Sequence, residues 1–298
     1  MQTAYREPKT RGLSAQMLYY GLQPLILVSA LSYWSLAPSS ELTYVLIVLA
    51  VQLVLGTLEH WQPARPTWVI QAKQKCLNIL LVVFLVNLSF LFSLYYESIL
   101  LPPLDFIRAR LGIDFWPHQW PLVLQVFLAF LCSEFIWYWL HRAEHRWQIV
   151  WRASGHGAHH AFKKLNALNF GLNHPLESLV LLLPPLIVEV VFGVGIASAG
   201  ATILVVTQAS IAHTNLSFNS KLIGLVLTTN TYHIRHHSAL IEESNTNYGC
   251  AAIIWDRIFG TFADSSVLEV GIGPTEPTLW EKLLMPIKEP KDSAVAPK

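Results

Sequence analysis

The chain has 298 residues, of which 53% are hydrophobic and 13% are charged, and its formal net charge is +1. Soluble domains carry about 25% charged residues, so this composition argues against a soluble protein and indicates a membrane protein. The small net charge offers no basic surface for nucleic acid, and no nucleic-acid partner is expected. The cysteines Cys76, Cys132 and Cys250 lie far apart without a CxxC pair, which disfavours a disulfide framework or a thiolate metal site.

Apolar stretches long enough to cross a bilayer follow one another along the chain. They cover residues 17–37, 42–58, 77–101 and 120–140. The stretch 178–213 is long enough for a hairpin of two shorter spans, with a glycine-containing turn inside it. The first stretch follows basic residues, but its apolar core is too long for a signal peptide, so we expect a retained span. The sequence predicts an all-α polytopic membrane protein with about four to six transmembrane helices.

The distribution of Lys and Arg predicts the orientation of these spans. Basic residues gather before the first span, after the second and after the fourth, whereas the other connecting loops are acidic or mixed. Because Lys and Arg mark cytoplasmic loops, a six-span chain has both termini and its histidine clusters in the cytoplasm. We therefore expect a cytoplasmic, histidine-rich helical cap on an integral membrane protein. The membrane would be the endoplasmic reticulum in a eukaryote or the inner membrane in a bacterium.

Eight of the twelve histidines fall into three short motifs. These are HRAEH with His141 and His145, HGAHH with His156, His159 and His160, and HIRHH with His233, His236 and His237. Residues three and four apart share one face of a helix, so each motif aims its imidazoles at one point. Eight convergent imidazoles exceed what one tetrahedral zinc uses, and two metal ions, about 3.5–4 Å apart in known two-metal sites, suit them better. The alternative is three solvated, basic helix ends.

The donor types narrow the choice of metal. No cysteine and only one carboxylate, Glu144, lies inside the motifs, which disfavours soft-ligand copper and iron–sulfur sites. A centre embedded in lipid meets mostly C–H bonds, whose cleavage needs a strong oxidant that iron and O₂ can supply. Glu134 lies seven residues before His141 in a predicted span. An intramembrane carboxylate is a functional candidate, and a hydrogen bond to a neighbouring helix is the equal alternative.

The order of motifs over residues 120–265 resembles the fatty acid hydroxylase / sterol desaturase superfamily of membrane-bound, non-haem di-iron enzymes. The resemblance rests on HRAEH, HGAHH, NHPLE, HTN, HIRHH, NYG and WDRIFGTF. It implies that the eight motif histidines are metal ligands, and it adds His213 of HTN as a further ligand. For His174 of NHPLE three roles stay open: a metal ligand, a hydrogen-bond partner of a ligand, or a helix cap. His60 and His118 match no motif and are expected at the membrane interface.

Ligand imidazoles usually donate their other N–H to a carboxylate or a carbonyl, and Glu144, Glu177 and Asp256 are candidates for that role. No catalytic side chain beyond the metal centre is predicted. The implied organisation is N-terminal spans over residues 1–119, a catalytic domain over 120–265 and a loose cytosolic tail over 266–298.

The implied activity is an O₂-dependent oxidoreductase that hydroxylates or desaturates a C–H bond of a membrane lipid, of sterol or fatty-acyl type. Two iron ions serve as the cofactor. Electrons come from NAD(P)H through a separate cytochrome b5 or ferredoxin, because the sequence lacks a His-Pro-Gly-Gly haem motif. Basic residues around the first motifs either dock this donor or only mark the cytoplasmic side. They are Arg142, Arg146, Arg152, Lys163 and Lys164.

Two other functions compete with this interpretation. A zinc-dependent membrane lipid amidase or hydrolase would need an open coordination position and a general base, which motifs made only of histidine do not favour. A metal transporter would place its site near the bilayer midplane on broken helices, whereas these histidines lie at the ends of predicted spans.

Overall fold

The computed structural model describes residues 13–288, apart from the side chain of Ser14. The expectations for the basic N-terminal segment 1–12 and for tail residues 289–298 lie outside the described residues. Within the described range the fold is all-α, as predicted, and its β-structure is limited to one isolated bridge between Ser238 and Val270.

Six long helices form the body of the described chain. They are α1 (Leu13–Leu36), α2 (Glu41–Trp61), α3 (Ala72–Leu111), α4 (Leu122–Arg146), α7 (Pro175–Phe192) and α8 (Ile196–His213). The short α-helices are α5 (Gln148–Ser154), α6 (Gly157–His160), α9 (Asn230–His236), α10 (Ile241–Ser244), α11 (Ile254–Phe259) and α12 (Leu279–Leu284). Single 3₁₀ turns are η1 (Pro66–Trp68), η2 (Ala167–Gly171) and η3 (Ile223–Leu225).

Five of the long helices, α2, α3, α4, α7 and α8, are long and apolar enough to cross a membrane, which indicates an integral membrane protein. The predicted hairpin is confirmed, because α7 and α8 are joined by a turn in which Gly193 and Gly195 have φ values of +64° and +65°. α1 is a helix but is not among these five, so the number of candidate spans agrees with the predicted four to six and is one fewer than the six used to orient the chain. One reason is its polar content: buried Gln23 on α1 donates to Gln208 on α8 at 3.0 Å.

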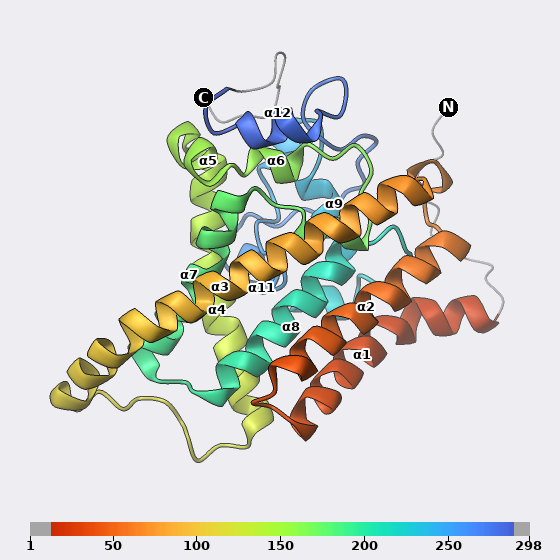
Figure 1. Cartoon of the computed structure of the whole chain (residues 1–298). Coiled ribbons are helices and arrows are strands. Elements are labelled where there is room, and N and C mark those ends of the chain that lie inside the picture. The colour runs from red at the N-terminus through yellow and green to blue at the C-terminus, as the bar shows by residue number, and fades with distance from the viewer. Residues whose placement is uncertain (1–12, 289–298) are drawn as a thin grey trace.

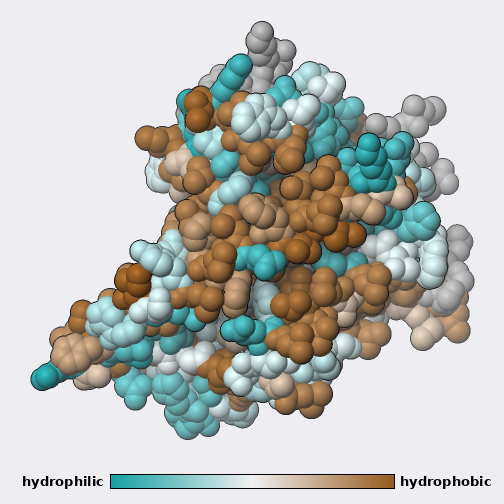
Figure 2. All heavy atoms as spheres, in the orientation of Figure 1, coloured by the Kyte–Doolittle hydropathy of each residue, from teal (hydrophilic) through white to brown (hydrophobic). Residues whose placement is uncertain are grey.

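α4 packs against both α7 and α8, and α1 and α2 also pack against α8. The short helices α5, α6, α9 and α12 gather at one end of the long helices (Figure 1). We call residues 147–174 and 214–288 the cap. Apolar side chains cover much of the long helices on the face shown in Figure 2, as expected for a surface in contact with lipid.

The chain continues into the cap beyond residue 265. Gly271 N donates to His237 O at 2.9 Å, and Ile272 N donates to His160 O at 3.0 Å. Met285, just after α12, is buried with Ile272. Residues 281–288, expected to belong to a loose tail, are therefore partly helical and packed, because Met285 packs in one apolar cluster with Ala158 of α6.

Candidate metal centre

Four helices bring nine histidines together at the junction of the long helices and the cap. The last two turns of α4 carry His141 and His145, and α8 ends at His213. The remaining six come from α6 and α9 and from the residues that flank them, namely His156, His159, His160, His233, His236 and His237. All nine side chains are buried. The HxxHH spacing therefore folds into short helices, as predicted.

The nine imidazoles form two groups whose ligand atoms lie within 4.8 Å of one another. The five-histidine group contains His141, His145, His156, His160 and His236. In it, His141 Nε2 lies 3.0 Å from both His156 Nε2 and His236 Nε2, and His145 Nε2 lies 3.1 Å from His156 Nε2. The four-histidine group contains His159, His213, His233 and His237. Its Nε2 atoms are similarly close, with His213 3.0 Å from His233 and 3.2 Å from His159.

Each HxxHH motif is divided between the two groups, which differs from the expectation that one motif points at one place. His156 and His160 join the five-histidine group while His159 joins the other. Around a helix axis, residue i+4 is displaced from residue i by about 40° in one direction, and residue i+3 is displaced in the opposite direction. The side chains at i and i+4 therefore point to the same group, and the side chain at i+3 points to the other.

HIRHH is divided in the opposite sense, because His233 and His237 belong to the four-histidine group and His236 belongs to the five-histidine group. The two groups adjoin where the rings of His160 and His237 stack, with centroids 4.4 Å apart. Together the two HxxHH motifs place two metal-sized positions side by side.

The outer nitrogens of the imidazoles fix the state of the inner ones. In the five-histidine group, His141 Nδ1 lies 2.6 Å from the Tyr248 carbonyl oxygen and His236 Nδ1 lies 2.9 Å from the Thr246 carbonyl oxygen. A carbonyl only accepts, so these Nδ1 atoms carry the hydrogen and a neutral ring then has a bare lone pair on Nε2. The facing Nε2 atoms of His141 and His236 therefore have no proton to share. A metal cation between them would resolve this arrangement.

The histidines are held neutral by their surroundings. Burial lowers the pKa of His156, His159 and His160 well below the usual value for histidine, and neighbouring imidazoles lower it further. The same holds for His233, His236 and His237. Neutral imidazole is the form that coordinates metal ions, so the cage is in its ligand state at neutral pH.

Two buried carboxylates lie behind the five-histidine group. Glu177 on α7 accepts from His156 Nδ1 at 2.6 Å, and Glu144 on α4 lies 3.6 Å from the same nitrogen. Both contact the outer side of the His156 ring, and neither belongs to the two histidine groups. A carboxylate at this position orients the ring and raises its basicity as a ligand.

Glu134 and Asp256 accept hydrogen bonds from backbone N–H groups and none from an imidazole. Glu134 accepts from Ala251 N at 2.9 Å and from Ala252 N at 3.0 Å. Asp256 accepts from Tyr248 N and Gly249 N, both at 2.7 Å. Asp256 therefore reaches the centre only through the segment whose Tyr248 carbonyl contacts His141. Of the two roles weighed for Glu134, the structure shows the hydrogen bond to a neighbouring segment.

The other three histidines lie outside both groups. His174 begins α7, where its Nδ1 accepts from Leu176 N at 3.1 Å and its Nε2 donates to Leu283 O at 3.2 Å. It is a helix cap that also fixes α12. His60 at the end of α2 and His118 in the loop before α4 are exposed.

Residues 245–248 contact three imidazoles of the five-histidine group, a role that was not predicted from the sequence. His145 Nδ1 lies 3.3 Å from Asn245 Oδ1, and the next acceptors along the segment are the Thr246 and Tyr248 carbonyls described above. Carbonyl acceptors have no side-chain signature, and only the NYG match pointed to this place.

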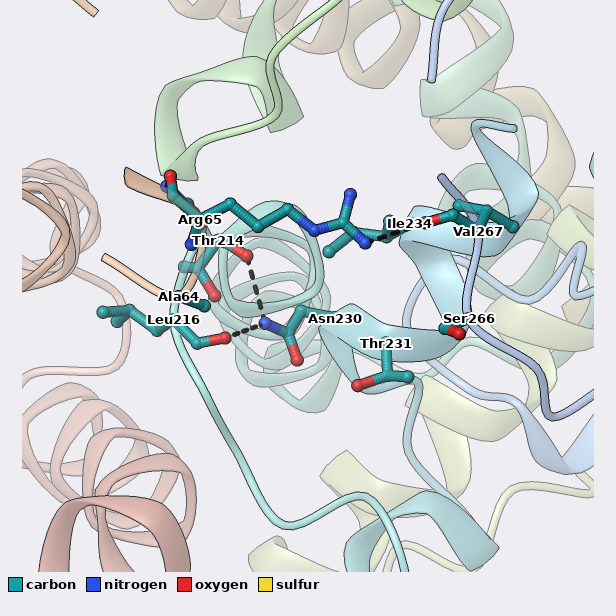
Figure 3. A pocket seen from close by; sticks show the side chains of 10 residues that line it. Ala64, Arg65, Thr214, Leu216, Asn230, Thr231, Ile234, Ser266 and Val267 are labelled. Atoms are coloured by element: carbon teal, nitrogen blue, oxygen red, sulfur yellow. Dashed lines mark hydrogen bonds between the residues drawn. The ribbon is translucent and has the colours of Figure 1, made fainter. Parts of the chain in front are cut away.

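A cavity of about 20 Å³ lies between the end of α8 and α9 (Figure 3). Asn230 at its wall donates to Thr214 O at 3.1 Å and to Leu216 O at 2.5 Å, and Arg65 Nη2 reaches across to Val267 O at 3.1 Å. The volume suits about one water molecule and no lipid. Asn230 ties the residues after His213 to the helix that carries His233.

Gly155 provides a test of how closely the cap packs around His174, the residue that caps α7. Its φ is +75°, and a Cβ there would lie 2.4 Å from His174 Cγ. Gly155→Ala should therefore lose about 1–2 kcal/mol from the left-handed backbone plus a further cost for the clash. Gly112→Ala is the matched control, since Gly112 has φ +63° and nothing within 4 Å of the added Cβ. Thermal unfolding in detergent should show the larger loss for Gly155→Ala, and equal losses would refute the close packing.

Comparison with known proteins agrees with this site. Residues 126–261 match the fatty acid hydroxylase family. The chain is 34% identical over 158 residues to an ornithine lipid hydroxylase from Rhizobium tropici, a match that covers 50% of this chain and 44% of the relative. It is 31% identical over 187 residues to the human alkylglycerol monooxygenase, covering 59% and 38%. A very-long-chain aldehyde decarbonylase from Oryza sativa subsp. indica is 28% identical over 167 residues, covering 55% and 61%.

The matched region spans less than two thirds of the length of each of these relatives. No solved structure gives a significant match. The matched region contains the motifs of α4 and α6, His213 and the HIRHH motif, which together supply all nine histidines of the two groups. The similarity to the fatty acid hydroxylase family thus covers residues 126–261, which is less than half of the chain.

Proposed function

We propose that the nine histidines bind two iron ions and that the chain uses O₂ to hydroxylate a C–H bond of a membrane lipid. The observation that carries this proposal is the inward convergence of Nε2 atoms in two groups, in which five of the nine outer nitrogens face an acceptor. Nine buried imidazoles without a cation would leave facing lone pairs and uncompensated polar atoms in the protein interior. Two groups, one of five and one of four, match two ions rather than one.

The all-imidazole donor set supports a redox metal. When bound, the iron pair would supply the activation of O₂ that oxidation of an unactivated C–H bond requires. The chain holds the ligands in place: Glu177 fixes His156, and the Trp137 ring stacks on the His141 ring with centroids 5.1 Å apart. Burial of all nine side chains also keeps bulk water from the oxidising centre.

The names of the relatives favour hydroxylation over desaturation. The Rhizobium tropici relative is named a lipid hydroxylase and the human relative a monooxygenase of alkylglycerol. We infer a lipid substrate that reaches the centre from the bilayer. Residues 120–265 form the catalytic domain in this proposal, and residues 266–288 complete its cap.

We further propose that the cap faces the cytoplasm and receives electrons from a separate cytochrome b5 or ferredoxin supplied by NAD(P)H. Two of the basic side chains near the first motifs form hydrogen bonds within the chain, which makes them less available for docking. Arg152 donates to the carbonyls of Pro286 and Ile287, and Lys163 Nζ donates to Gly271 O at 3.0 Å. Arg146 and Lys164 are exposed, so they are the better candidates to meet an acidic donor.

The test is product analysis under ¹⁸O₂ in membranes that contain the protein, a reductant and an NAD(P)H-dependent electron-transfer system. A lipid product that gains one ¹⁸O atom supports hydroxylation. A product that loses two hydrogens without label would indicate desaturation instead. A zinc-dependent amidase or hydrolase would release a cleaved lipid without consuming O₂, and that result would contradict the proposal.

A further inference from the structure

One short segment orients the ligands of only one histidine group. Residues 245–248 supply acceptors to the Nδ1 atoms of His141, His145 and His236, at 2.6, 3.3 and 2.9 Å. All three belong to the five-histidine group. With Glu177 behind His156, four of the five ligands in this group have a fixed ring orientation and tautomer.

This segment is itself held rigidly. Asn247 is buried and has φ +56°, the left-handed region, where it lets the flanking carbonyls of Thr246 and Tyr248 point at different ligands. Its Nδ2 donates to Tyr232 O at 3.1 Å and to Ala263 O at 2.9 Å, and its Oδ1 accepts from Ala263 N at 2.8 Å. The side chain of Asn247 thus stabilises a backbone shape that is unfavourable for most residues.

The four-histidine group lacks such support. His213 Nδ1 donates to Ala209 O at 2.7 Å, one turn earlier on α8. The Nδ1 atoms of His159, His233 and His237 are buried and have no hydrogen-bond partner among residues 13–288. No hydrogen bond at Nδ1 therefore sets the tautomers of these three imidazoles. Their ring orientations have to be fixed when the metal binds.

We propose that the two metal positions differ in affinity, and that residues 245–248, held by Asn247, make the five-histidine group the tighter one. The inference rests on the proposed metal centre. Loss of one partner behind a ligand typically costs about 10–100-fold in metal affinity. Because four ligands are oriented in the five-histidine group and only one in the four-histidine group, the metal affinities of the two positions should differ by at least about tenfold.

The neighbouring residues His236 and His237 allow a matched test, because one belongs to each group. The full-length protein in detergent is loaded with Fe(II) without O₂ and challenged with a chelator, and the iron that remains is measured over time. The wild type should release one ion quickly and the other at least about tenfold more slowly. His237→Ala should keep the slow ion, and His236→Ala should keep only the fast one.

Asn247→Gly tests the segment itself, because glycine keeps the left-handed backbone and removes the three side-chain hydrogen bonds. It should accelerate the slow release about 10–100-fold and leave the fast release unchanged. Asn169→Ala is the control, since Asn169 is equally buried but accepts from Asn166 N in η2, away from this segment. Acceleration of both phases to the same extent would show general loosening and overturn the positioning role.

Two ions that leave at one rate, or a slow ion that survives His236→Ala, would overturn the unequal affinities while leaving a two-metal centre intact. Failure of the wild type to bind iron at all would overturn the proposed function as well. These results differ from each other, so failure of this inference is distinguishable from failure of the metal centre.

Discussion

His141→Ala is expected to lower the rate of lipid oxidation at least about a hundredfold. This loss exceeds the effect of removing a residue that only hydrogen-bonds to a metal ligand, which is about 10–100-fold. His141 Nε2 is 3.0 Å from both His156 Nε2 and His236 Nε2, so its removal opens the centre of the five-histidine group. The variant should also lose one of its two metal ions. Metal analysis and product formation, measured on the same preparation, check both expectations.

His60→Ala is the control for this substitution, because His60 is exposed at the end of α2 and belongs to neither group. It should keep both its metal content and its activity. Undiminished activity in His141→Ala would contradict the assignment of this residue as a ligand.

Asp256→Ala is expected to cause the largest loss of stability, about 3–5 kcal/mol, since each lost hydrogen bond to a buried charged group costs about 1–3 kcal/mol. Asp256 is fully buried and accepts from Tyr248 N, from Gly249 N and from Thr261 Oγ1 at 2.6 Å. Its removal leaves two backbone amides unpaired and releases the carbonyl that contacts His141. Thermal unfolding in detergent measures the loss.

Asp114→Ala provides the comparison, because Asp114 lies in the loop before α4 and its side chain is 77% exposed. We expect almost no change in its unfolding temperature. Equal unfolding temperatures for the two variants would contradict the role of Asp256 in holding residues 248–249.

The long helices and the eight motif histidines were predictable because both follow simple periodicities, whereas His213 was predicted only through the resemblance of HTN. Stretches of about 20 apolar residues predict membrane helices, and the i, i+3, i+4 spacing predicts imidazoles on one face of a helix. α1 shows the limit of the first rule: its Gln23 Nε2 donates to Gln208, a residue 185 positions away, which no local pattern reveals. The packing of Met285 against α6 was missed for the same reason.

The division of each HxxHH motif between two groups could not be predicted, because it depends on how α6 and α9 face each other. The sequence favoured Glu144, Glu177 and Asp256 as partners of ligands, and the structure places only Glu177 within hydrogen-bonding distance of an imidazole. The other acceptors are mostly main-chain carbonyls, as with Thr246 and Tyr248. A carbonyl is present at every residue, so only the fold selects which ones matter.

The most direct test of the central claim is the metal content of the full-length protein, purified in detergent from iron-replete cells and measured by mass spectrometry. His159→Ala, which removes a ligand of the four-histidine group, is measured beside it. The account predicts about two iron ions per chain in the wild type and about one in the variant. One zinc without iron, or a folded wild-type protein with no metal, would contradict it.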